Sequence, residues 1–399
     1  MKLTFLLTFF ATLVSYFKFR HCIGSNWATP DQYIHACYSD IPALFGERGL
    51  STGAWSYASG SNSVEYPVLT GTIMWLLAKL TFGSGAVGYF YINAVFIAGL
   101  FISLGFLIQR MKPELAYLYA LAPAAVASLY INWDLWAIIS MVAAIYWFDR
   151  KKFDYSALAL GISVATKFMP IFLLLPVIYL FWHQRSYKAL ARYLAIFTSV
   201  VVLINLPFAL TTPTGWWRFY ELNLNRSSDW GSIWYSLSAL GINLSNINYL
   251  SILLLLIGFA ALAIYLLELS KVPELAEISF IVLAVVMTAS KVYSPQYVLW
   301  LVPLAVLALN NKKDVYAFWV WQGAEMIYHL AIWQHLAVVT DAKFGLPADL
   351  YALISLARMA ALGFFISVLV RRGLSTSRRA SNSHKTLREF LFESADKYP

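Results

Sequence analysis

The stretch Tyr249–Leu267, "YLSILLLLIGFAALAIYLL", contains no charged residue and decides the class of the protein. A transmembrane helix needs about 20 predominantly apolar residues to cross the hydrocarbon core of a bilayer. The whole chain of 399 residues has a similar character, because 60% of its residues are hydrophobic and only 12% are charged. A soluble globular protein has about 25% charged residues. The sequence therefore predicts an all-α, polytopic integral membrane protein, and its continuous apolar runs exclude the alternating pattern of a β-barrel.

About twelve apolar segments are predicted as membrane spans, with both termini in the cytoplasm. They are Leu3–Phe17, Ala86–Ile108, Leu115–Ile131, Trp133–Phe148, Tyr155–Ala165, Pro170–Trp182, Ala189–Phe208, Tyr249–Leu267, Ile278–Ala289, Tyr297–Leu309, Val315–Trp333 and Leu350–Val370. In this topology the basic excess lies in the cytoplasmic connections and the tail, as the positive-inside rule requires. The net charge of +9 is thereby explained and gives no reason to expect a nucleic-acid partner.

The predicted domain organisation is simple. Residues 1–370 form one transmembrane domain, and residues 371–399 form a polar, basic cytoplasmic tail near anionic lipid. Two long extracytoplasmic loops cover residues 18–85 and 209–248. The apolar segment Tyr66–Gly83 lies in the first of them, and we interpret it as an interfacial or re-entrant helix, because a span there would reverse the charge rule.

Two cysteines, Cys22 and Cys37, both lie in the first extracytoplasmic loop. A pair of cysteines confined to one loop outside the cytoplasm is compatible with a disulfide. The alternative is two unpaired thiols at the edge of the loop. The sequence does not decide between them.

Two lysines interrupt apolar segments on the extracytoplasmic side. Lys167 in "ATKFMP" and Lys291 in "SKVYSP" each stand close to a proline, between stretches too short to span alone. A lysine in lipid costs about 2.5–3.5 kcal/mol on insertion scales, so it must reach water or a partner. One interpretation is a pair of cations that bind an anion such as a lipid-linked phosphate, and the alternative is that both snorkel to the surface.

Acidic residues of the first loop are candidates for acid–base chemistry. Asp40 in "CYSDIP" is either a helix N-cap or a general base that removes a proton from an attacking hydroxyl. Glu65 before "YP" is either a ligand for sugar hydroxyls or an ion-pair partner of Arg48. Asp134 in "YINWD" is interpreted as a helix cap, and Glu325, in the middle of a predicted span, as the partner of Arg358.

Other polar residues give weaker signals. The tryptophans Trp216, Trp217, Trp230 and Trp234 of the second loop suit either a sugar or the membrane interface, and belts of this kind are more often interfacial. His329 and His335 are too isolated to predict a metal site. The chain has no Walker loop and no GxSxG motif.

The order of these motifs resembles the membrane-embedded GT-C glycosyltransferases. The relevant features are an early helix, a first outer loop with "SD", an "EYP" helix, a helix pair broken at "ATKFMP" and the later "SKVYSPQYVLWLVPL". More narrowly, the chain is similar to the actinobacterial polyprenol-phosphate-mannose-dependent α-mannosyltransferases of glycosyltransferase family 87. The resemblance extends from about Leu3 to Val370. Many relatives have two adjacent acids in the first loop, whereas here Asp40 is followed by Ile41, which makes a metal-dependent subgroup a poor match.

The resemblance implies specific roles for several residues. Asp40 matches the position of the catalytic base. Lys291 and Lys167, with Arg48 or Arg218, would bind the donor phosphate, and Glu65, Tyr66 and Gln296 would contact the acceptor or the sugar. No cofactor or metal is implied.

The resulting hypothesis is an inverting glycosyltransferase of the cytoplasmic membrane with its active site on the extracytoplasmic face. It would move a hexose, mannose by resemblance, from a polyprenyl-phosphate carrier to a glycolipid or polysaccharide acceptor. The alternative is a secondary transporter or a flippase for lipid-linked sugars, because helices broken around charges also occur in transporters.

Overall fold

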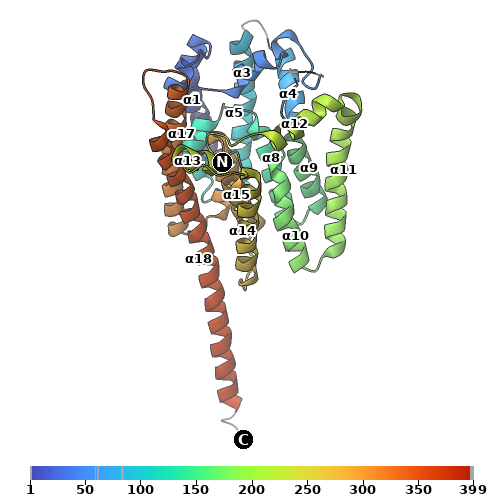
Figure 1. Cartoon of the computed structure of the whole chain (residues 1–399). Helices are drawn as coiled ribbons and strands as arrows, with labels where there is room; N and C mark the ends of the chain where they lie inside the picture. The colour runs from blue at the N-terminus through green and yellow to red at the C-terminus, as the bar shows by residue number, and fades with distance from the viewer. Residues whose placement is uncertain (1, 59, 61–62, 82–84, 396–399) are drawn as a thin grey trace.

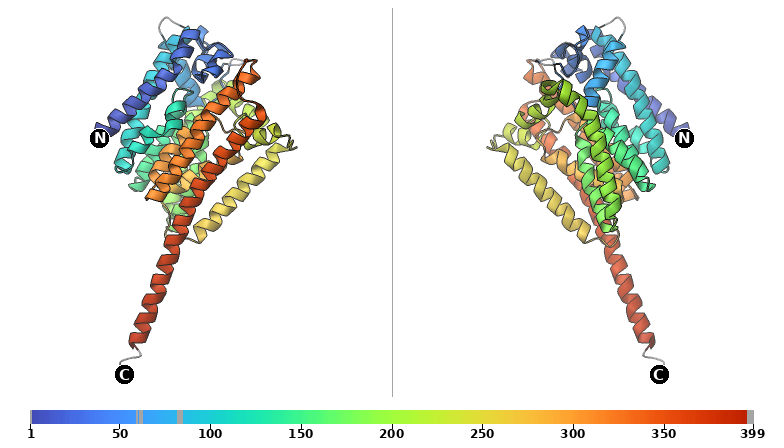
Figure 2. Two further views of the ribbon diagram at one scale, coloured as in Figure 1. Left: turned by 90° about the vertical axis from the view of Figure 1, so that its left-hand side faces the viewer. Right: turned by 90° about the vertical axis from the view of Figure 1, so that its right-hand side faces the viewer.

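The computed structural model describes residues 2–58, 60, 63–81 and 85–395, and the regular structure of these residues is helical (Figures 1 and 2). The elements are α1 (Lys2–Ser25), α2 (Asp31–Ile34), α3 (Asp40–Glu47), η1 (Leu50–Thr52), α4 (Val68–Lys79), α5 (Gly85–Met111), α6 (Tyr117–Leu121), α7 (Pro123–Ser128), α8 (Asp134–Asp149), α9 (Phe153–Thr166), η2 (Met169–Leu173), α10 (Leu174–His183), α11 (Tyr187–Thr211), α12 (Pro213–Asn225), α13 (Ile233–Ala239), α14 (Ile247–Leu267), α15 (Leu275–Ala289), η3 (Pro295–Tyr297), α16 (Val298–Ala308), α17 (Lys312–Val339) and α18 (Ala348–Ala395). The predicted all-α class is confirmed.

Five of the described helices are long and apolar enough to cross a membrane: α1, α5, α11, α14 and the first 30 residues of α18. The prediction of about twelve full spans is therefore not confirmed, although the chain is a multi-pass membrane protein. Several predicted spans are instead shorter helices. At 1.5 Å per residue, the 15 residues of α15 reach about 22 Å, less than the roughly 30 Å of a hydrocarbon core.

Breaks in the apolar segments explain why these helices are short. The predicted span Leu115–Ile131 is divided into α6 and α7 at Pro123, whose ring keeps the preceding Ala122 in an extended conformation. Two further breaks occur at Lys167, between α9 and η2, and after α15, before η3. At these breaks, polar backbone and side chains lie beside the ends of apolar helices.

The helix α4 corresponds to the apolar segment of the first loop predicted to be extracytoplasmic. It has 12 residues, about 18 Å, and is too short to cross a bilayer, in agreement with the prediction that Tyr66–Gly83 does not span. Residues 82–83 of that segment lie outside the described part of the chain. In Figure 1, α3 and α4 lie at the upper end of the molecule, far from the C-terminal end of α18.

The C-terminal tail is helical. Residues 371–395, predicted as a polar, basic tail, continue α18 as an uninterrupted helix that projects from the bundle (Figures 1 and 2). The start of this projection is held by Arg372, which makes ion pairs with Glu277 on α15 and Asp314 on α17. Both carboxylates are buried, so the basic tail begins at an internal anchor.

Candidate active site

Ser39 and Asp40 stand at the start of α3, and only Ser39 caps the helix with its side chain. The Ser39 hydroxyl caps the helix by accepting the Ile41 backbone N–H at 3.2 Å, and it donates to the carbonyl of Tyr130 at 2.8 Å. The backbone N–H of Asp40 donates to the carbonyl of Ile131 at 2.8 Å. The N-cap interpretation of Asp40 is therefore wrong, because Ser39 fills that role and leaves the Asp40 carboxylate available.

The carboxylate of Asp40 is positioned by one hydrogen bond. The Tyr38 hydroxyl donates to its Oδ1 at 2.8 Å, and the Tyr38 ring packs against Trp333 of α17 with ring centres 5.3 Å apart. Burial raises the pKa of the Asp40 carboxyl to about 6, and the negative charges of Asp134 and Asp229 act in the same direction. The Tyr38 hydrogen bond and the positive charge of Lys167 oppose this rise in pKa. Asp40 remains partly accessible to solvent.

Lys167 is near enough for its charge to act on Asp40, and its ammonium group is held by contacts with two other residues. Its Nζ is 2.9 Å from Oδ1 of Asp134 and 3.9 Å from the centre of the Tyr66 ring. Only 14% of its side chain is exposed, so Lys167 is part of the polar cluster and does not simply snorkel to the surface. Its backbone is extended because α9 ends at the preceding Thr166.

Asp134 corrects a second prediction. It is the first residue of α8, and its side chain makes no capping bond; instead Asn132 Oδ1 accepts the backbone N–H of Asp134 at 2.9 Å. The carboxylate is 2% exposed and pairs with Lys167. Its other oxygen, Oδ2, has no hydrogen-bond partner in the described part of the chain. Asp134 is therefore a member of the site that the sequence analysis assigned only to helix capping.

Asp229, which the sequence analysis missed, completes the acidic side of the cluster. Its Oδ2 accepts from the Ser294 hydroxyl at 3.1 Å and lies 3.9 Å from the Arg226 guanidinium. The backbone N–H of Asp229 donates to the carbonyl of Lys291 at 2.8 Å, and Lys291 Nζ donates to the carbonyl of Arg226 at 2.7 Å. Partial burial and the nearby Arg226 charge lower the pKa of Lys291. The second loop predicted to be extracytoplasmic and the break at Lys291 are thus held together by hydrogen bonds.

Arg358 of α18 contacts both the second loop and the segment after α15. Its guanidinium donates to the carbonyls of Gly231 and Tyr293, both at 2.9 Å, and stacks on the rings of Tyr293 and Tyr328. The predicted ion pair with Glu325 is confirmed, with 3.6 Å between the charged groups and both side chains buried. The same arginine therefore balances Glu325 and fixes the two loops that contain Asp229 and Lys291.

The remaining predicted site residues are placed differently. Arg48 and Glu65 form a two-bond ion pair, with Nε–Oε2 at 2.7 Å and Nη2–Oε1 at 2.5 Å. The ion-pair alternative for Arg48 and Glu65 is therefore present, and their roles toward phosphate and sugar stay predictions. Arg218 lies on α12 and lines a cavity of about 330 Å³ together with Glu221 and Arg226. Gln296 is buried in η3, next to the Lys291 loop.

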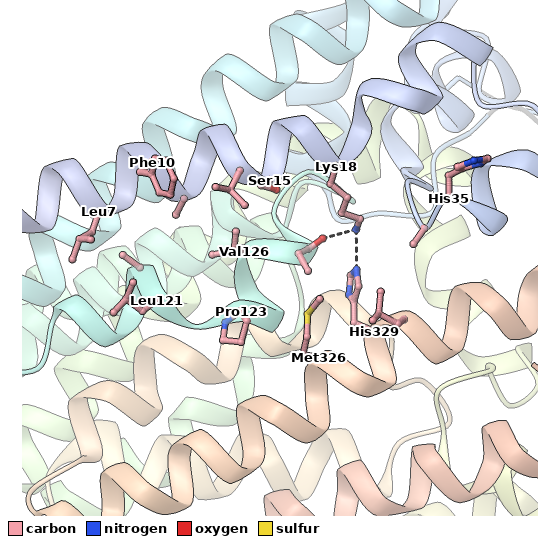
Figure 3. Close-up of a pocket in the computed structure, with 16 residues that line it drawn as sticks. Leu7, Phe10, Ser15, Lys18, His35, Leu121, Pro123, Val126, Met326 and His329 are labelled. Atoms are coloured by element: carbon pink, nitrogen blue, oxygen red, sulfur yellow. Dashed lines mark hydrogen bonds between the residues drawn. The ribbon is translucent and has the colours of Figure 1, made fainter.

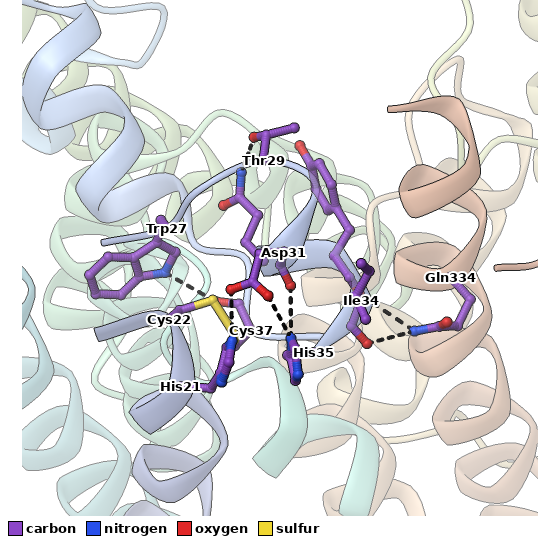
Figure 4. The surroundings of a disulfide bond; sticks show 11 residues. His21, Cys22, Trp27, Thr29, Asp31, Ile34, His35, Cys37 and Gln334 are labelled. Carbon is purple, nitrogen blue, oxygen red and sulfur yellow. Dashed lines mark hydrogen bonds and ion pairs between the residues drawn. A yellow bond between two sulfur atoms is a disulfide. The ribbon is translucent and has the colours of Figure 1, made fainter. Parts of the chain in front are cut away.

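The disulfide pairing left open by the sequence is present in the structure. Cys22 at the end of α1 is bonded to Cys37, with 5.9 Å between their Cα atoms (Figure 4). Trp27 Nε1 donates to the carbonyl of Cys37 at 3.0 Å inside the closed loop. The bridge ends three residues before Asp40, so it fixes the chain that leads into the site.

An apolar cavity of about 490 Å³ lies between α1 and the helices α6, α7 and α17 (Figure 3). Its walls come from α1, α6, α7 and α17, and include Leu7, Phe10, Val14, Leu121, Val126 and Met326. Lys18 and His329 stand at one end, with Lys18 Nζ 2.8 Å from His329 Nε2 and 2.6 Å from the carbonyl of Ala127. Trp333 Nε1 contacts His329 at 3.2 Å, which links this end of the cavity to Tyr38 and Asp40.

Comparison with known proteins identifies one family and one solved structure. The sequence model described as Glycosyltransferase family 87 matches residues 65–290. The chain is also similar to the structure of ArnT from Cupriavidus metallidurans bound to undecaprenyl phosphate, at 15% identity and a TM-score of 0.44, over 86% of this chain and 74% of that one. No curated protein matches the sequence.

Proposed function

The chain belongs to glycosyltransferase family 87, and we propose that it transfers a hexose from a polyprenyl-phosphate carrier to an extracytoplasmic glycolipid or polysaccharide. Mannose is the proposed sugar, on the resemblance noted above. The observation that supports the proposal best is the cluster of Asp40, Lys167 and Asp134 with the nearby Asp229. Carboxylates and cations meet there at the ends of apolar helices, where a lipid substrate would present its polar head.

Asp40 is the proposed general base. In an inverting transfer, the acceptor hydroxyl attacks the anomeric carbon while Asp40 takes its proton, and the bond from that carbon to the phosphate oxygen breaks. The electron pair leaves with the phosphate. A base works best when its pKa lies near the working pH, and a pKa of about 6 leaves Asp40 ionised at neutral pH yet basic enough to accept a proton.

Lys167 and Lys291 are the proposed cations for the leaving phosphate, now joined by Arg226 in place of Arg48. Lys291 and Arg226 lie together on one side of Asp229, and Lys167 lies next to Asp40. Fixed positive charge that faces developing negative charge in a site shielded from water is often the largest catalytic contribution. Lys167 is already paired with Asp134, so its main proposed role is to orient the site, and Lys291 with Arg226 provides most of the charge for the phosphate.

The apolar cavity near Lys18 supports a lipid substrate. Its walls are mostly aliphatic, with Lys18 and His329 at its polar end, and this end is linked to Tyr38 through His329 and Trp333. Such a slot suits the hydrocarbon chain of a lipid-linked substrate. We expect one chain of such a substrate to occupy it.

A transfer assay with purified protein tests the proposal. Polyprenyl-phosphate-mannose labelled in the sugar is incubated with an envelope lipid extract, and label in new glycolipid is measured for wild type and for Asp40→Asn. We expect transfer by wild type and a loss of at least about 100-fold in the variant, since a positioned base contributes about 10²–10⁴. Full activity of Asp40→Asn would reject this base. Movement of intact donor across vesicles without any transfer would favour the flippase.

A further inference from the structure

A second polar cluster lies on the outer loop beside the disulfide, apart from the Asp40 site (Figure 4). Within the part of the chain that the structure describes, His21, Asp31 and His35 each place one ligand atom within 4.8 Å of the other two. His21 Nε2 is 2.7 Å from Asp31 Oδ2, and His35 Nδ1 is 3.1 Å from Asp31 Oδ1. The two imidazole rings stack with their centres 3.5 Å apart.

From this geometry we propose that His21, Asp31 and His35 bind a divalent transition-metal ion, with Zn²⁺ as the preferred ion. Two imidazoles and one carboxylate are a common ligand set for zinc, and three protein ligands leave a fourth position for water or another ligand. Bonds of about 2.0–2.1 Å in a tetrahedron separate the ligand atoms by about 3.4 Å. The present separations are 2.7 Å from His21 Nε2 to Asp31 Oδ2 and 3.1 Å from His35 Nδ1 to Asp31 Oδ1. They are shorter than the tetrahedral spacing by about 0.7 and about 0.3 Å, so a bound ion requires both to widen.

The backbone around the cluster is fixed before any metal binds. His21 precedes Cys22, and Asp31 and His35 lie inside the loop that the Cys22–Cys37 bond closes. Asp31 and His35 are four residues apart on one helical turn, so their side chains share a face. The carbonyl of Ile34 accepts from Gln334 Nε2 at 3.0 Å, which attaches the loop to α17. The ligands are therefore presented by a constrained scaffold, which lowers the entropic cost of binding.

The side chains also remain accessible to an ion in solution. Their exposed fractions are 45% for His21, 34% for Asp31 and 44% for His35. A cation between them would separate the two stacked imidazoles. It would replace the hydrogen bond of His21 to the Asp31 carboxylate, and the contacts of His35 Nδ1 with that carboxylate and with the backbone carbonyl of Asp31. Because His35 also lines the apolar cavity, a bound ion would hold one edge of that cavity in place. Metal binding by these three residues does not require the proposed transfer reaction.

Direct metal titration of the full-length protein tests the proposal. The protein is purified in detergent without a polyhistidine tag and without reductant, stripped with EDTA, and titrated with Zn²⁺ by calorimetry and with Co²⁺ by visible absorption. We expect one ion per chain, the absorption of tetrahedral Co²⁺, and a higher Tm with Zn²⁺ because the ion binds the folded state.

Variants assign the binding to these ligands. His21→Ala, His35→Ala and the shape-conserving Asp31→Asn should each raise the Kd by at least about tenfold and remove the Zn²⁺-dependent rise in Tm. His183→Ala at the end of α10, an exposed histidine away from the loop, is the matched control and should bind like wild type. Absence of stoichiometric binding by wild type, or equal binding by wild type and all three ligand variants, would overturn the proposal. The Tm without metal shows whether each variant is folded.

Discussion

The surroundings of Asp40 disfavour the charged form of its side chain. Burial disfavours the charged carboxylate and raises its pKa to about 6 from an ordinary value of 3.8. Between these two values the folded state binds more protons than the unfolded state, so stability falls as pH rises through this window. Above pH 6 the full cost of the buried charge is present. The fold therefore gives up part of its stability to keep the Asp40 carboxylate in this environment, which suits its proposed role as a base.

Asp40→Asn should for this reason stabilise the protein while it abolishes transfer. At pH 7.5 we expect the free energy of unfolding to increase by about 1–3 kcal/mol, from the difference between the two pKa values. Thermal unfolding in detergent at pH 7.5 and at pH 4 measures this, and the gain should shrink at pH 4, where the folded carboxyl is neutral. Asp349→Asn, at an exposed position, is the control. An equal Tm for wild type and Asp40→Asn at pH 7.5 would contradict the argument.

Tyr38→Phe should change the strength of this base without removing it. The Tyr38 hydroxyl donates to Asp40 and lowers the pKa of the carboxyl, so its loss should raise that pKa further. One hydrogen bond of about 1 kcal/mol corresponds to about 0.7 pH unit. The acidic limb of kcat/KM against pH should move from about 6 toward 7, with activity at pH 8.5 nearly retained.

Tyr33→Phe is the matched control for this profile. The Tyr33 ring stacks on Tyr38 with centres 5.5 Å apart, and the substitution keeps the ring. The acidic limb of the kcat/KM profile of Tyr33→Phe should lie at the same pH as that of wild type. A Tyr38→Phe limb that does not move would mean that another group sets the pH dependence.

At the scale of elements, the ends of helices build the site. Asp40 begins α3, Asp134 begins α8, Lys167 follows α9, and Lys291 lies between α15 and η3. Sequence reasoning found Lys167 and Lys291 because a lysine interrupts an apolar run at each position. It assigned Asp134 to capping and missed Asp229, because the identity of their partners depends on which distant segments meet. The pairing of Arg48 with Glu65 was named as an alternative, and only tertiary contact distinguishes it from ligand binding.

The loop closed by Cys22 and Cys37 should contribute measurably to stability. Bridging two cysteines 15 residues apart restricts the unfolded chain by about 3 kcal/mol in the chain-entropy account. The double variant Cys22→Ala/Cys37→Ala should therefore have a lower Tm, and a lower transfer rate because the loop leads directly into Tyr38 and Asp40. Adding reductant to wild type should reproduce the loss, whereas reductant should not change the double variant. Unchanged stability in both cases would show that the loop is held by its other contacts.

At the scale of the whole molecule, composition predicted the class correctly and topology only in part. Hydrophobicity identifies apolar runs, but it does not say whether a run such as Leu115–Ile131 remains one helix or divides at Pro123. The division is decided by backbone geometry and by the polar groups that the freed ends find in neighbouring segments. The ion pairs of Arg372 could not be predicted from the sequence for the same reason, because its partners Glu277 and Asp314 lie on two other helices.

The hydrogen bonds from Ser39 and Asp40 to Tyr130 and Ile131 also have a consequence for biosynthesis. Asp40, the proposed base, is synthesised early, but Tyr130 and Ile131, whose carbonyls fix the start of its helix, are synthesised much later. Trp333, against which Tyr38 packs, is synthesised later still. A nascent chain stalled in the insertion machinery before these segments enter the bilayer would display an aspartate without a positioned active site. On the proposed mechanism, competence to react with lipid-linked sugar is therefore acquired only after the segment that contains Trp333 is in place.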